Sequence, residues 1–221
     1  VLDGDFGVLS EDLRAALERT NVTNDAQIAT IDDLLNASRI ERGKLEFFFE
    51  ENDLEPVVTT LVEQMQPLAQ MKKMTIEYTK PSQSLPNIMM DKEKVRQVLN
   101  NMIDNAIKYS KSGAIVVTLK QESKDLIVKV KDTGKGISKE ELGALFNKYT
   151  RGHDSVTHAT GLGLGMYVAK VIVEQHNGKI WAESDGVGKG STFCFSLPVK
   201  STVHATTVDL AEPGSDAGPA K

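Results

Sequence analysis

The chain has 221 residues, 40% of them hydrophobic, which is enough for one domain of roughly 100–150 residues and an appendage, but not for two large domains. The formal net charge of -5, from 26 basic and 31 acidic residues, gives no basic surplus for binding nucleic acids or an anionic membrane, so we expect neither partner. The single cysteine, Cys194, excludes an organising disulfide or cysteine-based zinc site, and no apolar run approaches the ~20 residues that cross a bilayer, which predicts a cytoplasmic protein.

A long helix is predicted over residues 10–42. Ser10 is expected to cap its N-terminus and Gly43 to end it. Six apolar residues form a stripe with nearly the spacing of two packed helices: Leu13, Leu17, Ile28, Ile31, Leu35 and Ile40. The polar segment 21–25, which forms helix poorly, interrupts this stripe, so we expect the first half of the helix to fray or kink.

Further helices and strands follow. The pattern predicts an extended segment over 45–54, a helix that opens around Pro56 and reaches residue 72, a strand over 74–79, a loop over 81–86 and a helix over 91–109. It then predicts a hairpin of 115–119 and 126–130, a short helix over 138–145, a polar loop over 147–160, a helix over 164–176, and a hairpin of 180–184 and 192–197. This order predicts an α+β fold, a two-layer α/β sandwich in which helices cover one face of a mixed sheet, with a helical segment in front.

The helix over 91–109 has two different faces. Asn101, Asn105 and Lys108 follow at i, i+4 and i+7 and therefore share one face, opposite the apolar residues Val95, Leu99, Met102, Ile103 and Ala106. A polar stripe is usually just a solvated surface, but asparagine is a mediocre helix former. Its carbonyl oxygen can complete a magnesium shell, and a lysine can meet phosphates. Both interpretations remain open from these residues alone.

Two glycine-containing turns are the next candidates. Asp132-x-Gly134-x-Gly136 directly follows a strand. It is either an ordinary turn or a place where the aspartate accepts a hydrogen bond from an adenine amino group while the glycines admit the base. Gly161 and Gly163 precede the helix from 164, and such a turn either flexes or offers backbone N–H groups to phosphate. Neither the dinucleotide fingerprint nor a Walker A loop is present.

An aromatic segment precedes the polar loop. Phe146 and Tyr149 can clip the loop to the core, and Arg151 can reach a phosphate.

Taken in order, these patterns resemble the N, G1, F and G2 boxes of bacterial sensor histidine kinases. The four motifs are Asn-x-x-x-Asn-Ala-x-Lys-Tyr, Asp-x-Gly-x-Gly, Phe-x-x-Tyr-x-Arg and Gly-Leu-Gly-Leu, all between residues 101 and 165. The resemblance covers about residues 5–199 and points to the ATP-binding catalytic domain of the superfamily shared with gyrase, the Hsp90 chaperones and the MutL repair proteins. It implies ATP and Mg²⁺ as cofactors.

The resemblance also implies a role for each matching position. Asn105 would bind magnesium and Asp132 would recognise adenine. The implied catalytic residues are Asn101, which would assist at the nucleotide, Lys108, which would contact a phosphate, and Arg151, which would lie near the γ-phosphate. The other positions implied to contact the nucleotide are Tyr109, Gly134, Gly136, Ile137, Thr160, Gly161, Leu162, Gly163 and Leu164.

The first residues resemble part of the histidine-kinase dimerisation hairpin. Residues 2–7 are similar to the loop between its helices, and residues 32–45 to the end of its second helix and the exit linker. We therefore expect a partial dimerisation and histidine phosphotransfer hairpin over 1–44, a catalytic domain over 45–199 and a disordered tail over 200–221. The helix with the phosphate-accepting histidine is expected outside these residues, as is any membrane anchor of the parent protein. The four histidines present are expected to be solvated or packed: His153, His158, His176 and His204.

The implied function is binding of Mg-ATP and transfer of its γ-phosphoryl group to a histidine on a dimerisation helix, in a homodimer, for relay to an aspartate of a response regulator receiver domain. These residues alone are not expected to label themselves. The alternative is a non-catalytic nucleotide-binding scaffold or decoy module. An ATPase of the gyrase or chaperone type would need an activating carboxylate on the helix over 91–109, and Glu93 is too far along that helix from Asn101.

Overall fold

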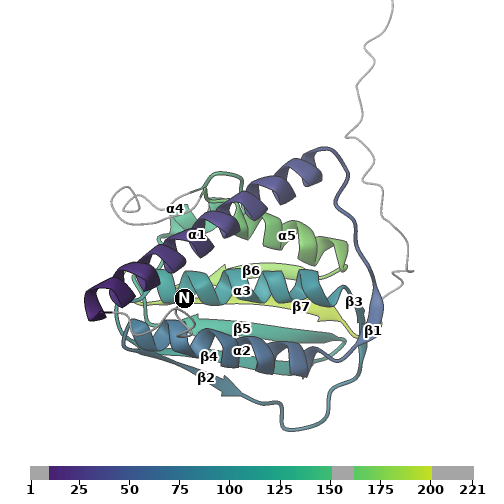
Figure 1. The fold of residues 1–221 in the computed structure, drawn as a ribbon. Helices are drawn as coiled ribbons and strands as arrows, with labels where there is room; N and C mark the ends of the chain where they lie inside the picture. Colours follow the sequence, from purple (N-terminus) through teal and green to yellow (C-terminus); the bar gives the residue numbers. More distant parts are fainter. Residues whose placement is uncertain (1–9, 151–161, 201–221) are drawn as a thin grey trace, which may run out of the picture.

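The computed structural model describes residues 10–150 and 162–200, which form a five-stranded sheet with helices on one of its faces (Figure 1). A long helix, α1 (Glu11–Glu41), crosses in front of the helical layer. This arrangement confirms the predicted α+β sandwich with a helical segment before it. The predictions for 1–9, for 151–161 and for the tail from 201 fall outside the described residues.

The central sheet is mixed. Its strand order is β2-β4-β5-β7-β6, with β2 (Met74–Thr79), β4 (Gly113–Glu122), β5 (Asp125–Asp132), β6 (Lys179–Glu183) and β7 (Ser191–Pro198). In this sheet β2 and β4 are parallel and all other neighbours are antiparallel. Both predicted hairpins are confirmed. The β5–β7 register pairs Asp132 with Ser191, and this pairing later shapes the site.

Three helices cover one face of the sheet, namely α2 (Leu54–Met71), α3 (Lys92–Tyr109) and α5 (Gly165–Gln175). Apolar residues recur every three or four positions in each of them, so each helix buries one side against the strands. The five residues predicted for the apolar side of α3 are all 2% exposed or less: Val95, Leu99, Met102, Ile103 and Ala106. Burial of this side directs the opposite, polar side of α3 away from the sheet.

Helix α1 begins and ends where the sequence indicates. The Ser10 hydroxyl accepts a hydrogen bond from the Leu13 N–H, and Gly43 follows the helix with a φ of 64°. The helix runs through residues 21–25 without a break, so the expected fraying is wrong. Propensities of ordinary residues differ by less than about 1 kcal/mol each, which is too little to interrupt a helix of 31 residues.

The last turns of α1 pack on the domain. Asn36, Ala37 and Ile40 are buried, and Ile40 joins the main hydrophobic core. The apolar stripe is therefore divided, because Ile40 packs inward while five large side chains are 47–56% exposed: Leu13, Ile28, Ile31, Leu34 and Leu35.

A small second sheet joins the linker after α1 to the front of α3. The strand β1 (Glu50–Asn52) pairs antiparallel with β3 (Ile88–Met90), and β3 was not predicted. Asp91 caps α3 by accepting from the Lys94 N–H at 3.0 Å and also accepts from the Phe48 N–H at 2.9 Å. The Nε2 of His176, at the end of α5, accepts from the Asp91 N–H at 3.0 Å. With 1% exposure, His176 is packed, which is one of the two roles that were predicted for it.

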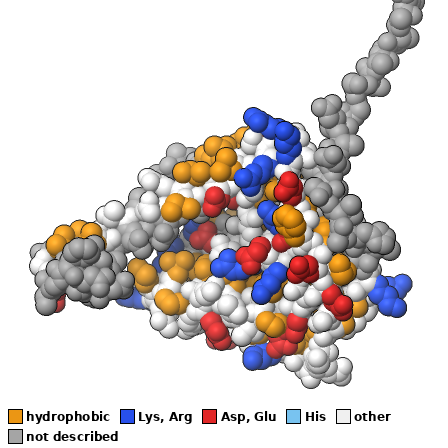
Figure 2. Space-filling view, turned by 45° about the vertical axis from the view of Figure 1, so that its right-hand side comes forward, with side chains coloured by type: hydrophobic (Ala, Val, Ile, Leu, Met, Phe, Trp, Pro, Cys, Tyr) orange, Lys and Arg blue, Asp and Glu red, His pale blue; other side chains and the backbone are white. Residues whose placement is uncertain are grey.

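The surface carries no large patch of one charge on the face seen in Figure 2, where acidic and basic side chains are interspersed. None of the described helices combines the length and apolar character that a membrane crossing requires.

Candidate functional site

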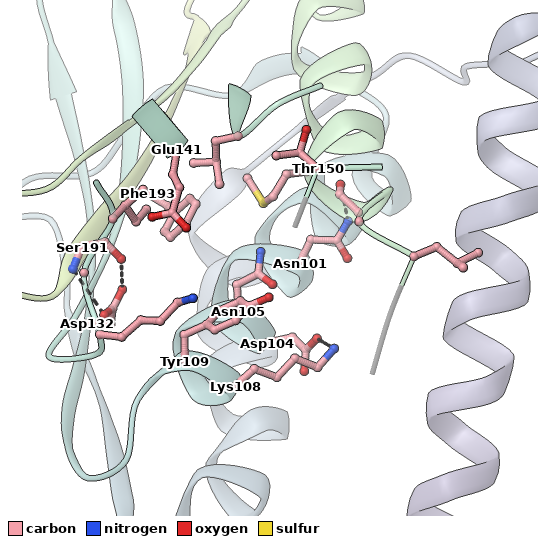
Figure 3. Close-up of a pocket in the computed structure, with 18 of the residues that line it drawn as sticks. Asn101, Asp104, Asn105, Lys108, Tyr109, Asp132, Glu141, Thr150, Ser191 and Phe193 are labelled. Atoms are coloured by element: carbon pink, nitrogen blue, oxygen red, sulfur yellow. Dashed lines mark hydrogen bonds and ion pairs between the residues drawn. The ribbon is translucent and has the colours of Figure 1, made fainter. Parts of the chain in front are cut away.

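A pocket lies where the C-terminal half of α3 meets the turn after β5 and the start of α5 (Figure 3). Helix α3 forms one wall, which carries amide, carboxylate, lysine and tyrosine side chains, and the turn after β5 forms a second wall. The lining residues from these two elements are Asn101, Asp104, Asn105, Lys108, Tyr109, Asp132, Lys135, Gly136 and Ile137. Residues from five other parts of the chain complete it: Asp33, Glu141, Leu145, Thr150, Leu162, Gly163, Gly165, Met166, Ser191 and Phe193.

The polar face of α3 lines the pocket as its spacing predicts. The Asn101 side chain is fixed, because its Nδ2 donates to the Gly165 carbonyl at 2.9 Å. Lys108 forms an ion pair with Asp104 at 2.6 Å. Asn105 points into the space between these residues and the Asp132 wall (Figure 3).

Asp132 is a buried carboxylate at the end of β5, 3% exposed. Its Oδ1 accepts from the Gly134 N–H at 2.7 Å and from the Ser191 N–H at 3.3 Å, while its Oδ2 accepts from the Ser191 hydroxyl. Three donors thus hold the buried charge in one orientation. Asp132 also lines the pocket.

Two glycines after Asp132 are required by space. A Cβ at Gly134 would lie 2.6 Å from the Tyr109 carbonyl oxygen, and a Cβ at Gly136 would lie 2.1 Å from the Gly186 carbonyl oxygen. Gly136 also has a φ of +69°, which side-chain-bearing residues rarely adopt. The turn can therefore pack tightly only with glycine at these positions. Gly136 and Ile137 line the pocket, whereas Gly134 lies behind them.

The turn before α5 forms the opposite edge of the pocket. Leu162 and Gly163 line it, and a Cβ at Gly163 would lie 2.6 Å from the Thr150 carbonyl oxygen. Leu164 is fully buried and precedes the first helical residue, so it supports the turn from behind. Arg151, Thr160 and Gly161 were also predicted for the site, but they fall outside the described residues.

The aromatic segment before this turn is only partly a core clip. Phe146 packs on the main core, as one interpretation predicted, but Tyr149 is 60% exposed with a φ of 61°. Between them Lys148 contacts Glu41 of α1 at 2.7 Å and lies 5.0 Å from the Tyr167 ring centroid. This contact fastens the end of α1 to the edge of the site.

Several pocket residues were missed because no local pattern marks them. Ser191 reaches Asp132 through strand pairing, and Phe193 and Glu141 approach from β7 and α4 (Lys139–Ala144). Lys135 lies 4.8 Å above the Tyr109 ring. The position of Lys135 between Gly134 and Gly136, which were both predicted for the site, was the one feature of the sequence that could have indicated it.

The carboxylate of Asp33 brings α1 into the pocket wall. A Cβ at Gly165 would lie 3.4 Å from its Oδ2, so the carboxylate lies beside the start of α5. Burial raises the pKa of the Asp33 carboxyl to about 6, Lys108 acts to lower it, and the carboxylates of Asp104 and Asp32 act to raise it. Asp33, Asp104 and Lys108, which all line the pocket, therefore interact electrostatically with one another.

Comparison with known proteins places this arrangement in a family. Residues 90–201 match the family of histidine kinase-, DNA gyrase B- and HSP90-like ATPases. The adaptive-response sensory kinase SasA of Synechococcus sp. (strain JA-2-3B'a(2-13)) is 35% identical over 172 residues, which are 76% of this chain and 45% of that protein. The sensor histidine kinase WalK of Bacillus subtilis (strain 168) is 32% identical over 189 residues, 82% of this chain and 30% of that protein.

A solved structure shares the fold. Full-length ShkA in complex with AMPPNP superposes with a TM-score of 0.71 at 22% identity, covering 92% of this chain and 42% of that one. The chain spans less than half the length of each of these relatives. It belongs to the histidine kinase-, DNA gyrase B- and HSP90-like ATPase family and carries the ATPase catalytic domain of the histidine kinases.

Proposed function

We propose that the chain binds Mg-ATP in this pocket and transfers the γ-phosphoryl group to a histidine on a dimerisation helix. The observation that carries the proposal is the meeting of the polar face of α3 with the Asp132 turn in one pocket, in a chain of the histidine kinase family. One wall offers a buried acceptor for a base, and the other offers amides and a lysine for phosphates and a metal.

At the base end, Asp132 accepts a hydrogen bond from the adenine amino group. This carboxylate is already oriented by three donors, so recognition costs little reorganisation. Gly136 and Ile137 form the floor beneath the base, and Gly134 keeps the turn behind it close to α3.

At the phosphate end, Asn105 supplies an oxygen to Mg²⁺, while Asn101, Lys108 and Tyr109 approach the phosphates. Lys108 would exchange its partner Asp104 for a phosphate oxygen. Leu162, Gly163 and Leu164 would offer backbone N–H groups at the start of α5. Arg151, Thr160 and Gly161 belong to the same proposal, although they lie outside the described residues. In such a site transfer depends mainly on positioning and on neutralisation of charge.

The residues fit magnesium. Within residues 10–150 and 162–200, no three His, Cys, Asp or Glu side chains are grouped to hold a metal by themselves. Magnesium bound with a nucleotide takes most of its ligands from phosphates and waters and needs one or two protein oxygens. Asn105 and Asp104 line the pocket with such oxygens.

We also propose that α1 belongs to a dimerisation hairpin of a homodimer, with a response regulator receiver domain as the acceptor of the relayed phosphoryl group. The large apolar side chains of α1 that remain half exposed in this chain support the dimer, because such a row is the usual seam of a helical bundle.

Calorimetric titration with ATP and magnesium tests binding, and incubation with radiolabelled ATP and a separately made two-helix hairpin containing an acceptor histidine tests transfer. We expect binding by the chain alone and labelling of the added hairpin. Binding without any transfer to that hairpin would favour the scaffold or decoy role, and absence of binding would refute both functions.

A further inference from the structure

The turn between β6 and β7, residues 184–190, packs against the Asp132–Ile137 turn from behind. The Gly188 N–H donates to the Lys135 carbonyl at 2.6 Å, and the Gly190 N–H donates to the Gly134 carbonyl at 3.2 Å. The contact is too close for side chains, since a Cβ at Gly190 would lie 2.3 Å from the Asp132 carbonyl oxygen. Any shift of this turn is therefore passed to the residues that line the base end of the pocket.

One side chain ties the two turns together. The Ser184 Oγ accepts from the Ile137 N–H at 3.0 Å and from the Gly186 N–H at 3.3 Å, and it donates to the Gly190 carbonyl at 2.7 Å. A serine hydroxyl has one proton and two lone pairs, so these three bonds use its full capacity. Ser184 itself is not part of the pocket wall, whereas Ile137 and Asp132 are.

We propose that Ser184 is a positioning residue for the base end of the nucleotide site. Its hydroxyl accepts from the Ile137 N–H and thereby positions the Ile137 backbone. It also donates to the Gly190 carbonyl and thereby holds Gly190 against Asp132, without touching the nucleotide. This role rests on the proposed binding of ATP, and it adds a residue that holds the recognition geometry from outside the pocket.

Removal of the Ser184 hydroxyl should weaken the binding of the base and leave the binding of the phosphates unchanged. In Ser184→Ala two backbone N–H groups and one carbonyl lose their partner, and we expect the affinities for ATP and for adenosine to fall by the same factor, about tenfold. Ser184→Thr keeps a hydroxyl and should restore most of the affinity for both. Lys108→Ala, at the other end of the pocket, should weaken ATP binding and leave adenosine binding close to that of the parent chain. Ser82→Ala, at an exposed serine in the loop before β3, is the matched control.

Calorimetric titration of each variant with ATP and adenosine tests the proposal. Reversible partial unfolding would also raise the apparent dissociation constant, by the inverse of the folded fraction, so urea unfolding of each variant measures that fraction. Only an increase in the dissociation constant beyond it counts as displacement of the site. Unchanged dissociation constants in Ser184→Ala, a loss confined to ATP, or no recovery in Ser184→Thr would each overturn the role of Ser184 while leaving ATP binding intact. Failure of the parent chain to bind ATP would overturn the proposed function and this role together.

Discussion

Replacement of Asp132 by asparagine changes one atom of the buried carboxylate and removes its charge. In the parent chain the Gly134 and Ser191 N–H groups both donate to Oδ1, and the asparagine carbonyl can accept from both in the same way. The amide nitrogen takes the place of Oδ2, whose partner is the Ser191 hydroxyl. Because a hydroxyl can both donate and accept, Ser191 can turn and accept from the new amide. Each polar group of the cluster therefore keeps a partner, and the fold should survive.

The two effects of this replacement differ in size. Within the protein, charge-assisted bonds become neutral ones, and the free energy of unfolding should fall by about 1–2 kcal/mol. For the nucleotide, an adenine amino group would lose a charged acceptor and meet an amide instead. Loss of such a bond costs about 1.5–3 kcal/mol, which corresponds to an increase of about 10- to 150-fold in the dissociation constant.

Calorimetric titration with ATP measures the affinity, and urea unfolding measures the stability. Asp125→Asn, at the far end of the same strand β5, is the matched control and should change neither by much. Unchanged ATP affinity in Asp132→Asn would remove this carboxylate from base recognition. An unfolded variant would show that the neutral hydrogen-bond network cannot replace the charged one.

Asn105→Ala should weaken ATP binding in the presence of magnesium more than in excess chelator, because the lost oxygen is proposed to serve the metal; equal losses in paired titrations would refute that role. Burial lowers the pKa of His176 from 6.5, so the unfolded chain takes up a proton first as the pH falls, and the stability held above about pH 6.5 is lost below it. Urea unfolding between about pH 7.5 and about pH 5.5 should thus show a smaller loss for His176→Gln than for the parent chain, and equal slopes would contradict a neutral His176. For Asp33, burial raises the pKa from 3.8 to about 6, so folding favours the protonated carboxyl. The stability that this protonated carboxyl contributes is lost as the pH rises from about 4 to about 6. Asp33→Asn should therefore stabilise the chain increasingly over that range in the same assay, and a destabilising effect at neutral pH would show that the charged carboxylate is favourable in place.

The local parts of the site could be predicted from the sequence. Asn101, Asn105 and Lys108 share a face because helical geometry repeats every 3.6 residues, and the burial of Leu99 and Met102 on the other side decides which face is free. The Asp132 turn was also recognisable, since an aspartate and two glycines after a strand are a short-range signal.

The tertiary structure alone decided how these parts are joined. Ser191 meets Asp132 across 59 positions of sequence through the β5–β7 register, and Ser184 meets Ile137 across 47. Asp33 enters the pocket because the last turns of α1 pack on the domain. The three-residue strands β1 and β3 are too short for an alternating pattern to predict them. Periodicity and turn chemistry depend on neighbours within a few residues, whereas strand register and helix docking depend on how the whole core packs. Asp132 could therefore be chosen as a candidate site residue from the sequence, but the hydrogen bonds that orient its carboxylate could not be predicted.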